Sequence, residues 1–263
     1  MNSKRVHLFE FEDQKWFPGF LRNYVTDFLQ FLSNKVKVYE PVVAIIQLTI
    51  QKTNVNKIID LGSGSGGGLL WLGKELQKKE LGLKIILTDL YPNSAAFKHT
   101  SKQSEIFDYY TQPVDAKNVP GNLSGFRTMF LSFHHLKPKD ARMVLQDAIE
   151  SNQSIGIFEI QDRGIPSIIA MLLSPLSVFI TTPFIRPFRF CRLIFTYLIP
   201  VVPLVVLWDG VVSCLRTYSV NEMKDLVETL TNKEHFIWEF NKKKSKTGFV
   251  IYTIGVPKPN VKE

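Results

Sequence analysis

A run of glycines between a short apolar strand and a helical segment most constrains how this chain can fold. The stretch IIDLGSGSGGG, at 58–68, is followed by LLWLGKELQKK, which has the spacing of a helix. Glycine enters left-handed backbone conformations without steric cost, so such a loop brings backbone N–H groups close to a ligand beside the positive end of a helix. We therefore expect a strand, a ligand-binding loop and a helix in that order.

Short apolar segments alternate with helical segments through much of the chain. The expected strands are residues 57–61, 84–90, 106–111, 127–133 and 154–160. This order predicts a mainly parallel sheet with helices on both faces, and such sheets bind ligands at the carboxyl ends of their strands. Two later strands, at 235–240 and 247–255, are linked by the lysine-rich NKKKSK, which predicts an antiparallel hairpin.

Composition restricts the class of protein and of partner. The chain has 263 residues, 45% apolar content and a formal charge of +8, which fits a folded protein and favours anionic partners. Its basic residues do not interleave with aromatic residues in one patch, so nucleic acid is not the expected partner. The two cysteines form no CxxC pair and no histidine cluster has ligand spacing, so we expect no disulfide framework and no metal site.

The first residues bear on the cellular compartment. Glu10, Glu12 and Asp13 interrupt the region where a secretory signal needs an apolar core. Together with the scarcity of cysteine, this predicts a cytoplasmic protein.

The glycine loop alone is compatible with two ligand classes. Gly62, Gly64 and Gly67 satisfy the G-x-G-x-x-G spacing of dinucleotide-binding proteins, and Asp89 follows at the separation of a ribose contact. A nicotinamide-dependent oxidoreductase is therefore one reading of the sequence.

A wider set of motifs resembles the class I S-adenosylmethionine-dependent methyltransferases. The stretch DLGSGSG at 60–66 resembles the first motif of that family, and Asp89 resembles its second acidic position. The segment around Asp115 resembles the third motif, FLSFHHL at 130–136 resembles the fourth strand, and the closing hairpin resembles the reversed last strand. The resemblance implies an α/β fold, namely a Rossmann-like, doubly wound, mainly parallel seven-stranded sheet with an antiparallel C-terminal hairpin. It also implies S-adenosylmethionine as cofactor, bound by Asp60, Gly62, Ser63, Gly64, Gly66, Asp89, Leu90, Asp115, Ala116 and Ser132.

Candidates for a proton-accepting group are few. His134 and His135 fall at the carboxyl end of the fourth strand, beside the expected cofactor sulfur, and each is also compatible with a purely structural role in the pocket wall. Glu159 ends the fifth strand on the same edge and is expected to act as a base or to pair with Arg163.

An apolar insertion follows the fifth strand. We expect an N-terminal helical and aromatic cap at 1–50, in which residues 23–51 have helical spacing, and a methyltransferase core at 51–163 and 211–263. Between the two core segments lies an apolar helical insertion at 164–210, which resembles the region where the family places substrate-specific additions. It has two uncharged runs, and the six prolines within and between them disfavour two membrane-spanning helices.

The insertion is expected either to lie on an anionic membrane surface or to form a lid. Arg186, Arg189 and Arg192 have i, i+3, i+6 spacing, which predicts one helical side that meets lipid phosphates while Phe188, Phe190 and Phe195 face inward. The alternatives are an apolar substrate lid or the interface of a homodimer. The expected substrate-contacting or lid residues are Arg186, Arg189, Arg192, Trp208, Asp209, Arg216 and Tyr218, with an Asp209–Arg216 ion pair as the structural alternative.

The function that these patterns favour is methyl transfer to a hydrophobic small molecule or a lipid, by a protein peripheral or monotopic on the cytoplasmic face of a membrane. Two alternatives stand beside it: an NAD(P)-dependent oxidoreductase, and a non-catalytic membrane-binding module that keeps the fold.

Overall fold

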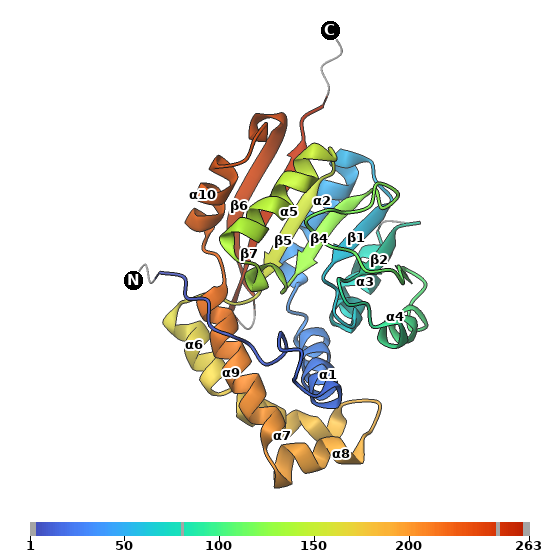
Figure 1. The fold of residues 1–263 in the computed structure, drawn as a ribbon. Coiled ribbons are helices and arrows are strands. Elements are labelled where there is room, and N and C mark those ends of the chain that lie inside the picture. Colours follow the sequence, from blue (N-terminus) through green and yellow to red (C-terminus); the bar gives the residue numbers. More distant parts are fainter. Residues whose placement is uncertain (1–3, 80–81, 246–247, 260–263) are drawn as a thin grey trace.

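A seven-stranded sheet forms the centre of the computed structural model, which describes residues 4–79, 82–245 and 248–259 (Figure 1). The strands are arranged in the order β3-β2-β1-β4-β5-β7-β6. Their bounds are β1 (Lys57–Leu61), β2 (Lys84–Thr88), β3 (Phe107–Tyr109), β4 (Phe126–Phe130), β5 (Ile155–Glu159), β6 (Phe236–Ser245) and β7 (Gly248–Pro257).

The strand directions confirm the predicted fold class. Strands β1 to β5 pair in parallel, while β7 pairs antiparallel with both β5 and β6. One detail of the prediction was wrong, because most of the lysine-rich NKKKSK lies in β6 and not in a link between strands. Lys242, Lys243 and Lys244 pair in register with β7, and Lys242 is half-buried whereas Lys243 and Lys244 are exposed.

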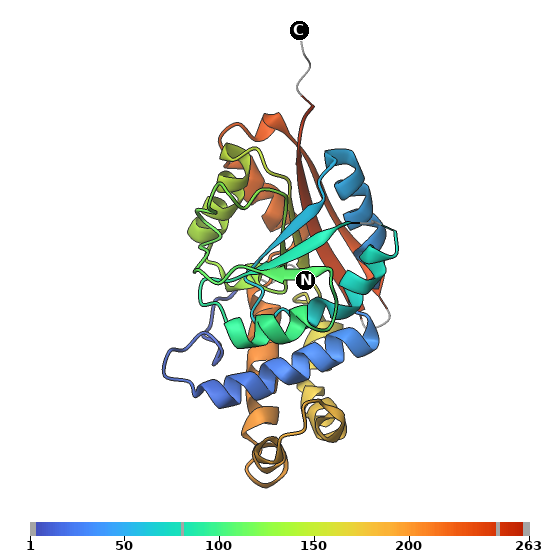
Figure 2. The same ribbon diagram turned by 90° about the vertical axis from the view of Figure 1, so that its right-hand side faces the viewer.

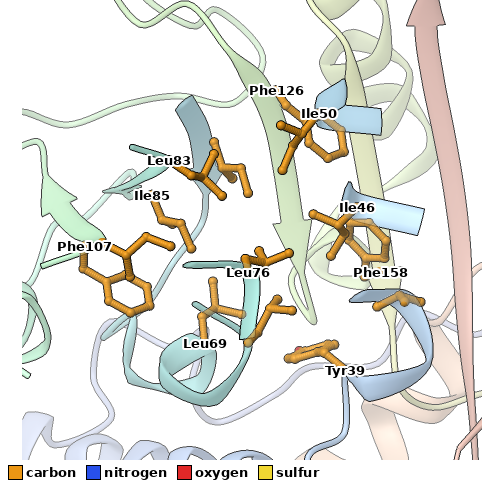
Figure 3. Packing of buried hydrophobic residues seen from close by; sticks show 14 of the residues in the cluster. Tyr39, Ile46, Ile50, Leu69, Leu76, Leu83, Ile85, Phe107, Phe126 and Phe158 are labelled. Atoms are coloured by element: carbon orange, nitrogen blue, oxygen red, sulfur yellow. The ribbon is translucent and has the colours of Figure 1, made fainter. Parts of the chain in front are cut away.

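Helices cover both faces of the sheet, as expected for a doubly wound fold. On one face, Ile46 and Ile50 of α2 pack against Phe158 and Phe126 of the strands, in a core that α3 and α4 complete (Figure 3). On the other face, α5 and α10 enclose a second core. The helix bounds are α2 (Val43–Thr53), α3 (Leu70–Gln77), α4 (Ser94–Ser101), α5 (Pro138–Glu150) and α10 (Val220–Glu228).

The predicted helical segment at 23–51 is two helices. Helix α1 (Gly19–Val36) ends at Lys37, whose φ of 55° is left-handed, and a short 3-10 turn, η1 (Glu40–Val42), precedes α2. The break separates their tasks, because α2 packs on the sheet while α1 lies below it, beside the insertion (Figures 1 and 2).

The apolar insertion forms a lobe that projects from the sheet, here called the insertion lobe (residues 165–216) (Figure 1). Val178, Val202 and Val206 of the lobe share a third core with Val25 and Phe28 of α1. Its elements are α6 (Ile165–Leu172), α7 (Ser174–Thr181), η4 (Thr182–Phe184), α8 (Phe190–Leu193), the π-helix η5 (Ile194–Leu198) and α9 (Val201–Arg216).

The predicted arginine face is absent from the insertion lobe. Arg186 precedes α8, whereas Arg192 is buried, donates to Asp27 of α1 at 2.7 Å and donates to two backbone carbonyls. Phe188 and Phe190, expected to face inward, are exposed, while Phe195 packs against the core of the lobe. The spacing failed as a guide because Pro187 and the short turns interrupt the helix that it assumed.

None of the helices in the described ranges has, by itself, both the length and the apolar composition that a membrane span requires. Two pairs of consecutive helices have this length and composition when taken together, but each pair is bent. Ile165–Leu172 and Ser174–Phe184 meet at 42°, and Phe190–Leu198 and Val201–Arg216 meet at 74°.

Candidate active site

The glycine loop lies at the carboxyl end of β1 and turns sharply. Gly62, Gly64 and Gly66 have φ values of 69°, 59° and 72°, a region that side-chain-bearing residues rarely occupy. A Cβ added to Gly66 would lie 2.4 Å from a methyl of Leu87, whereas a Cβ on Gly64 would meet no atom within 4 Å. Gly66 is thus required by packing, and Gly64 exposes bare backbone to open space.

Asp60 anchors this loop from within the sheet. It is buried and accepts hydrogen bonds from Ser63 Oγ at 2.6 Å and Thr128 Oγ1 at 3.0 Å. Burial raises the pKa of Asp60 to about 7, although the two hydrogen bonds lower it. A carboxyl group with no cationic partner among the described residues is thus held at the loop.

Asp89 joins the ends of β1 and β2. Its carboxylate accepts the backbone N–H groups of Gly64 and Tyr91, both at 2.8 Å. Its backbone carbonyl accepts from Val114 N–H, which brings the neighbouring Asp115 and Ala116 to the same edge. Leu90 is exposed there, and Ser132, after β4, lies against Gly62. The ten predicted cofactor residues therefore come from adjoining segments at one edge of the sheet.

Helix α1 lies over the loop, a contact that the sequence did not reveal. Asn34 donates to Gly67 O and accepts from Trp71 N–H, both at 2.7 Å, and Ser33 donates to Gly68 O. Tyr39, just after α1, is buried in the same region (Figure 3). Burial raises the pKa of Tyr39 well above its usual value, and the carboxylates of Glu159 and Asp60 raise it further.

His134 and Glu159 form a buried pair at the carboxyl ends of β4 and β5. His134 Nδ1 lies 2.9 Å from one carboxylate oxygen of Glu159, and the other oxygen accepts the His134 backbone N–H at 3.0 Å. Glu159 therefore fixes the ring of His134. The predicted pairing of Glu159 with Arg163 was wrong, because Arg163 contacts Glu222 at 2.6 Å.

His135 faces an acidic segment from the far end of the chain. Its Nδ1 lies 2.9 Å from Asp13 and 3.4 Å from Glu10. Burial alone lowers the pKa of His135, but the Asp13 hydrogen bond and the Glu10 carboxylate outweigh it and raise the pKa to about 9. Burial also acts on Asp13, yet His135 and Arg216 hold its pKa well below the usual range. Neither Glu10 nor Asp13 was among the predicted site residues.

The acidic segment belongs to the N-terminal strap (residues 5–17), which crosses α9. Asp209 accepts the backbone N–H groups of Phe11 and Glu12 at 2.8 and 3.2 Å, and Trp208 Nε1 donates to Phe9 O. Arg216 donates to Leu8 O and pairs with Asp13 at 2.7 Å and Glu10 at 3.2 Å. Asp209 and Arg216 thus hold the strap, and they do not pair with each other as the sequence suggested.

The remaining predicted substrate residues lie apart from one another. Tyr218 is buried, donates to Leu136 O at 2.8 Å and lies under the guanidinium of Arg5. Arg186 and Arg189 are exposed on the insertion lobe.

Distances alone allow a metal ion between Glu10, His134 and His135, whose ligand atoms lie within 4.8 Å of one another. The guanidinium of Arg216 already lies 3.2 Å from Glu10 and 3.4 Å from His135 Nδ1. A divalent ion would face that cation at close range, so we assign the positive charge here to Arg216 and to the proton of His135.

Neither a family model nor a curated protein matches this sequence. Solved structures do resemble the chain. The plantazolicin methyltransferase BpumL in complex with SAH has a TM-score of 0.55 at 16% identity, with 94% of each chain covered. The same enzyme with a pentazolic desmethylPZN analog and SAH has a TM-score of 0.60 at 11% identity, with 93% of this chain and 94% of that chain covered. The plantazolicin methyltransferase BamL with a triazolic desmethylPZN analog and SAH has a TM-score of 0.52 at 12% identity, with 91% and 98% covered. Together with the strand order, these likenesses show that the chain has the Rossmann-like fold of the methyltransferases.

Proposed function

We propose that this protein transfers a methyl group from S-adenosylmethionine to an apolar acceptor, a hydrophobic small molecule or a lipid. The observation that carries the proposal is the loop at the end of β1, where Asp60, the bare backbone of Gly64 and the carboxylate of Asp89 adjoin. The BpumL and BamL structures were solved with SAH, the product form of this cofactor, which supports the same ligand here.

The residues at the loop fit the cofactor. The open space at Gly64 admits a nucleoside against the backbone, and Asp89 keeps acceptor capacity for two ribose hydroxyls besides its two backbone donors. Asp60, a carboxyl without a cationic partner in the described structure, suits the positively charged amino-acid end. S-adenosylmethionine supplies an activated methyl group, so the protein contributes mainly position, worth as much as ~7–11 kcal/mol of the barrier.

The surroundings favour an apolar acceptor. Beyond the two histidines lie the strap and the insertion lobe, in which Phe9, Phe11 and Trp208 are in ring contact. The lobe itself is held by an apolar core shared with α1. A polar acceptor would find few partners there apart from the charged groups around His135.

Transfer of labelled methyl groups tests the proposal. The protein is incubated with methyl-labelled S-adenosylmethionine and an organic extract of cells that make it, and label is counted in the organic phase. We expect transfer with the wild type and with Asp108→Asn, an exposed control in β3. Asp89→Ala removes charge-assisted hydrogen bonds and is expected to reduce transfer at least tenfold, about 1.4 kcal/mol or more. Label that enters only water-soluble material, or oxidation of NADH by the protein, would overturn the proposal.

The outer face of the insertion lobe supports action at a membrane surface as part of the same proposal. Helix α6 has no buried residue, and the lobe exposes more large apolar side chains than a solvated surface normally bears. These are Ile165, Ile169, Leu172, Leu173, Leu176, Ile180, Phe184, Phe188, Phe190, Tyr197, Leu198, Ile199 and Leu204. The exposed Arg186 and Arg189 lie among them and provide charge for anionic headgroups.

Vesicle sedimentation tests the membrane part separately. We expect the protein to pellet with vesicles that contain phosphatidylglycerol, less with phosphatidylcholine alone, and less at high salt. Ile180→Glu and Leu198→Glu, both on the exposed tip, are expected to abolish pelleting, while Ile237→Glu on the exposed side of β6 is not. If the wild type stays in the supernatant, the surface is a lid or the contact of two copies, which light scattering would separate.

A further inference from the structure

We infer that His135 acts as a positively charged hydrogen-bond donor to the acceptor, and that the acceptor reacts through an oxygen bearing negative charge, as in a phenol, an enol or a carboxylic acid. The inference rests on the proposed methyl transfer and names the reacting group of its substrate.

Two carboxylates keep the proton on His135. Asp13 and Glu10 both approach Nδ1, at 2.9 and 3.4 Å, and a nitrogen between two carboxylate oxygens is a donor. Arg216 opposes the second proton from 3.4 Å, but its own charge is matched by contacts to the same two carboxylates. Glu12 is the fourth titratable group that interacts with the ring; burial raises the pKa of Glu12 to about 7, so its carboxylate favours the cation above that pH. The raised pKa of His135 agrees with this geometry.

The other ring nitrogen of His135 is available. Nε2 contacts no hydrogen-bond partner within the described part of the chain, and 30% of the side chain is exposed. His134 differs, since its side chain is only 2% exposed and Glu159 holds its Nδ1. The two rings lie 4.2 Å apart, so the enclosed His134 supports the orientation of the accessible His135. An Nε2–H donor is thus presented from a fixed ring.

The position of His135 is that of the acceptor. It follows β4 by five residues, and Ser132 in the same turn lies 3.3 Å from the place where a Cβ on Gly62 would be. The strap contacts the same ring through Asp13 and Glu10. A donor with a full positive charge here favours an oxygen anion and repels a protonated amine.

The positive charge of His135 is consistent with the proton and electron balance of the methyl transfer. The acceptor hydroxyl loses its proton to water, and the oxygen lone pair then forms the new bond to the methyl carbon as the carbon–sulfur bond breaks with its electrons to sulfur. His135 keeps its own proton throughout and shifts the acceptor equilibrium toward the anion.

A chromophoric phenol tests the inference directly. A 4-nitrophenol with an alkyl chain is added to the full-length protein saturated with S-adenosylhomocysteine, and its ionisation is followed by absorbance. We expect the pKa of the bound phenol to fall by about one unit or more, a tenfold effect. His135→Gln is expected to remove the shift and Asp13→Asn to reduce it, while His99→Gln, an exposed control, leaves it intact. A bound phenol with an unchanged or higher pKa, a shift that survives His135→Gln, or no binding at millimolar probe would overturn the inference.

Two further readings separate this result from fold and cofactor effects. The affinity for S-adenosylhomocysteine is measured for the wild type and for each variant. If the wild type does not bind it, the proposed function is refuted. If only a variant does not bind it, that variant is misfolded. Nitrogen-15 NMR of His135 at pH 7.5 then reports the ring without any acceptor. We expect protons on both ring nitrogens, whereas a single proton would contradict the inference whatever the fate of the proposed function.

Discussion

The carboxylate of Asp209 accepts the backbone N–H of Phe11 at 2.8 Å, across 198 residues of sequence. A second oxygen of the same side chain accepts from Glu12 N–H at 3.2 Å. Burial raises the pKa of Asp209 to about 6, although the two backbone donors lower it. Asp209 thus shares with Arg216 the task of fixing the strap that carries Glu10 and Asp13 to the histidines.

Removing that anchor is expected to loosen the strap. Asp209→Ala leaves two backbone donors without their acceptor and is expected to cost about 1–3 kcal/mol of unfolding free energy. Urea unfolding gives the cost, and hydrogen exchange at residues 6–17 locates it. Asp225→Ala, on the exposed side of α10, is the matched control and should change neither. Faster exchange confined to α9, with the strap unaffected, would show that Asp209 does not hold it.

The arginines of the insertion lobe are expected to differ sharply in their effect on stability. Arg192→Met leaves the Asp27 carboxylate without its closest partner and is expected to cost about 3 kcal/mol or more, because Arg192 is buried. Arg186→Met lies on the surface and should stay within about 0.5 kcal/mol of the wild type. Chemical denaturation measures both, and equal effects would contradict the burial of Arg192.

The glycine loop is expected to separate binding from folding. Gly64→Ala meets no neighbouring atom but keeps a left-handed φ of 59°, so we expect a stability loss of about 1–2 kcal/mol. Its methyl group enters the space assigned to the cofactor, so S-adenosylhomocysteine affinity should fall at least tenfold. Gly66→Ala collides with Leu87 and should lose more stability than Gly64→Ala. Calorimetry and thermal unfolding distinguish these outcomes, and full affinity in Gly64→Ala would place the cofactor elsewhere.

Cofactor affinity should depend on pH through Asp60. In the ligand-free protein its pKa is about 7, and the ionised form is the one that favours a cationic ligand. Affinity for S-adenosylmethionine is therefore expected to weaken as pH falls from 8 to 6, by about tenfold per pH unit once the pH is below that pKa. Asp60→Asn should bind weakly with a flat profile over the same range. A profile in Asp60→Asn as steep as that of the wild type would assign the titration to another group.

The parts of the structure that local spacing controls were predictable. The strands were predictable from their short apolar runs, and the glycine loop from its turn-forming residues between a strand and a helix. The antiparallel hairpin was predictable from two strands that are adjacent in sequence. Helix α10 begins at a capping box, in which Ser219 Oγ accepts from Glu222 N–H and Glu222 accepts from Ser219 N–H, another feature that local spacing controls.

The strap and the arginines were not predictable in the same way. Glu10 and Asp13 are too far from His135 in the chain for spacing to join them, and the burial of Glu10 is visible only in three dimensions. From the sequence, Glu10 and Asp13 were interpreted only as residues that interrupt a signal segment, whereas in the structure they neutralise Arg216 and His135. Arg192 is buried because it pairs with Asp27 of α1, a contact that helical periodicity could not predict.

Calorimetric titration with S-adenosylhomocysteine and with NADH tests the central claim most directly, because the glycine loop by itself is compatible with either ligand class. We expect saturable binding of one equivalent of S-adenosylhomocysteine by the wild type, at least tenfold weaker binding by Asp89→Ala, and no heat from NADH. Saturable binding of NADH with no response to S-adenosylhomocysteine would contradict the assignment of this protein as a methyltransferase.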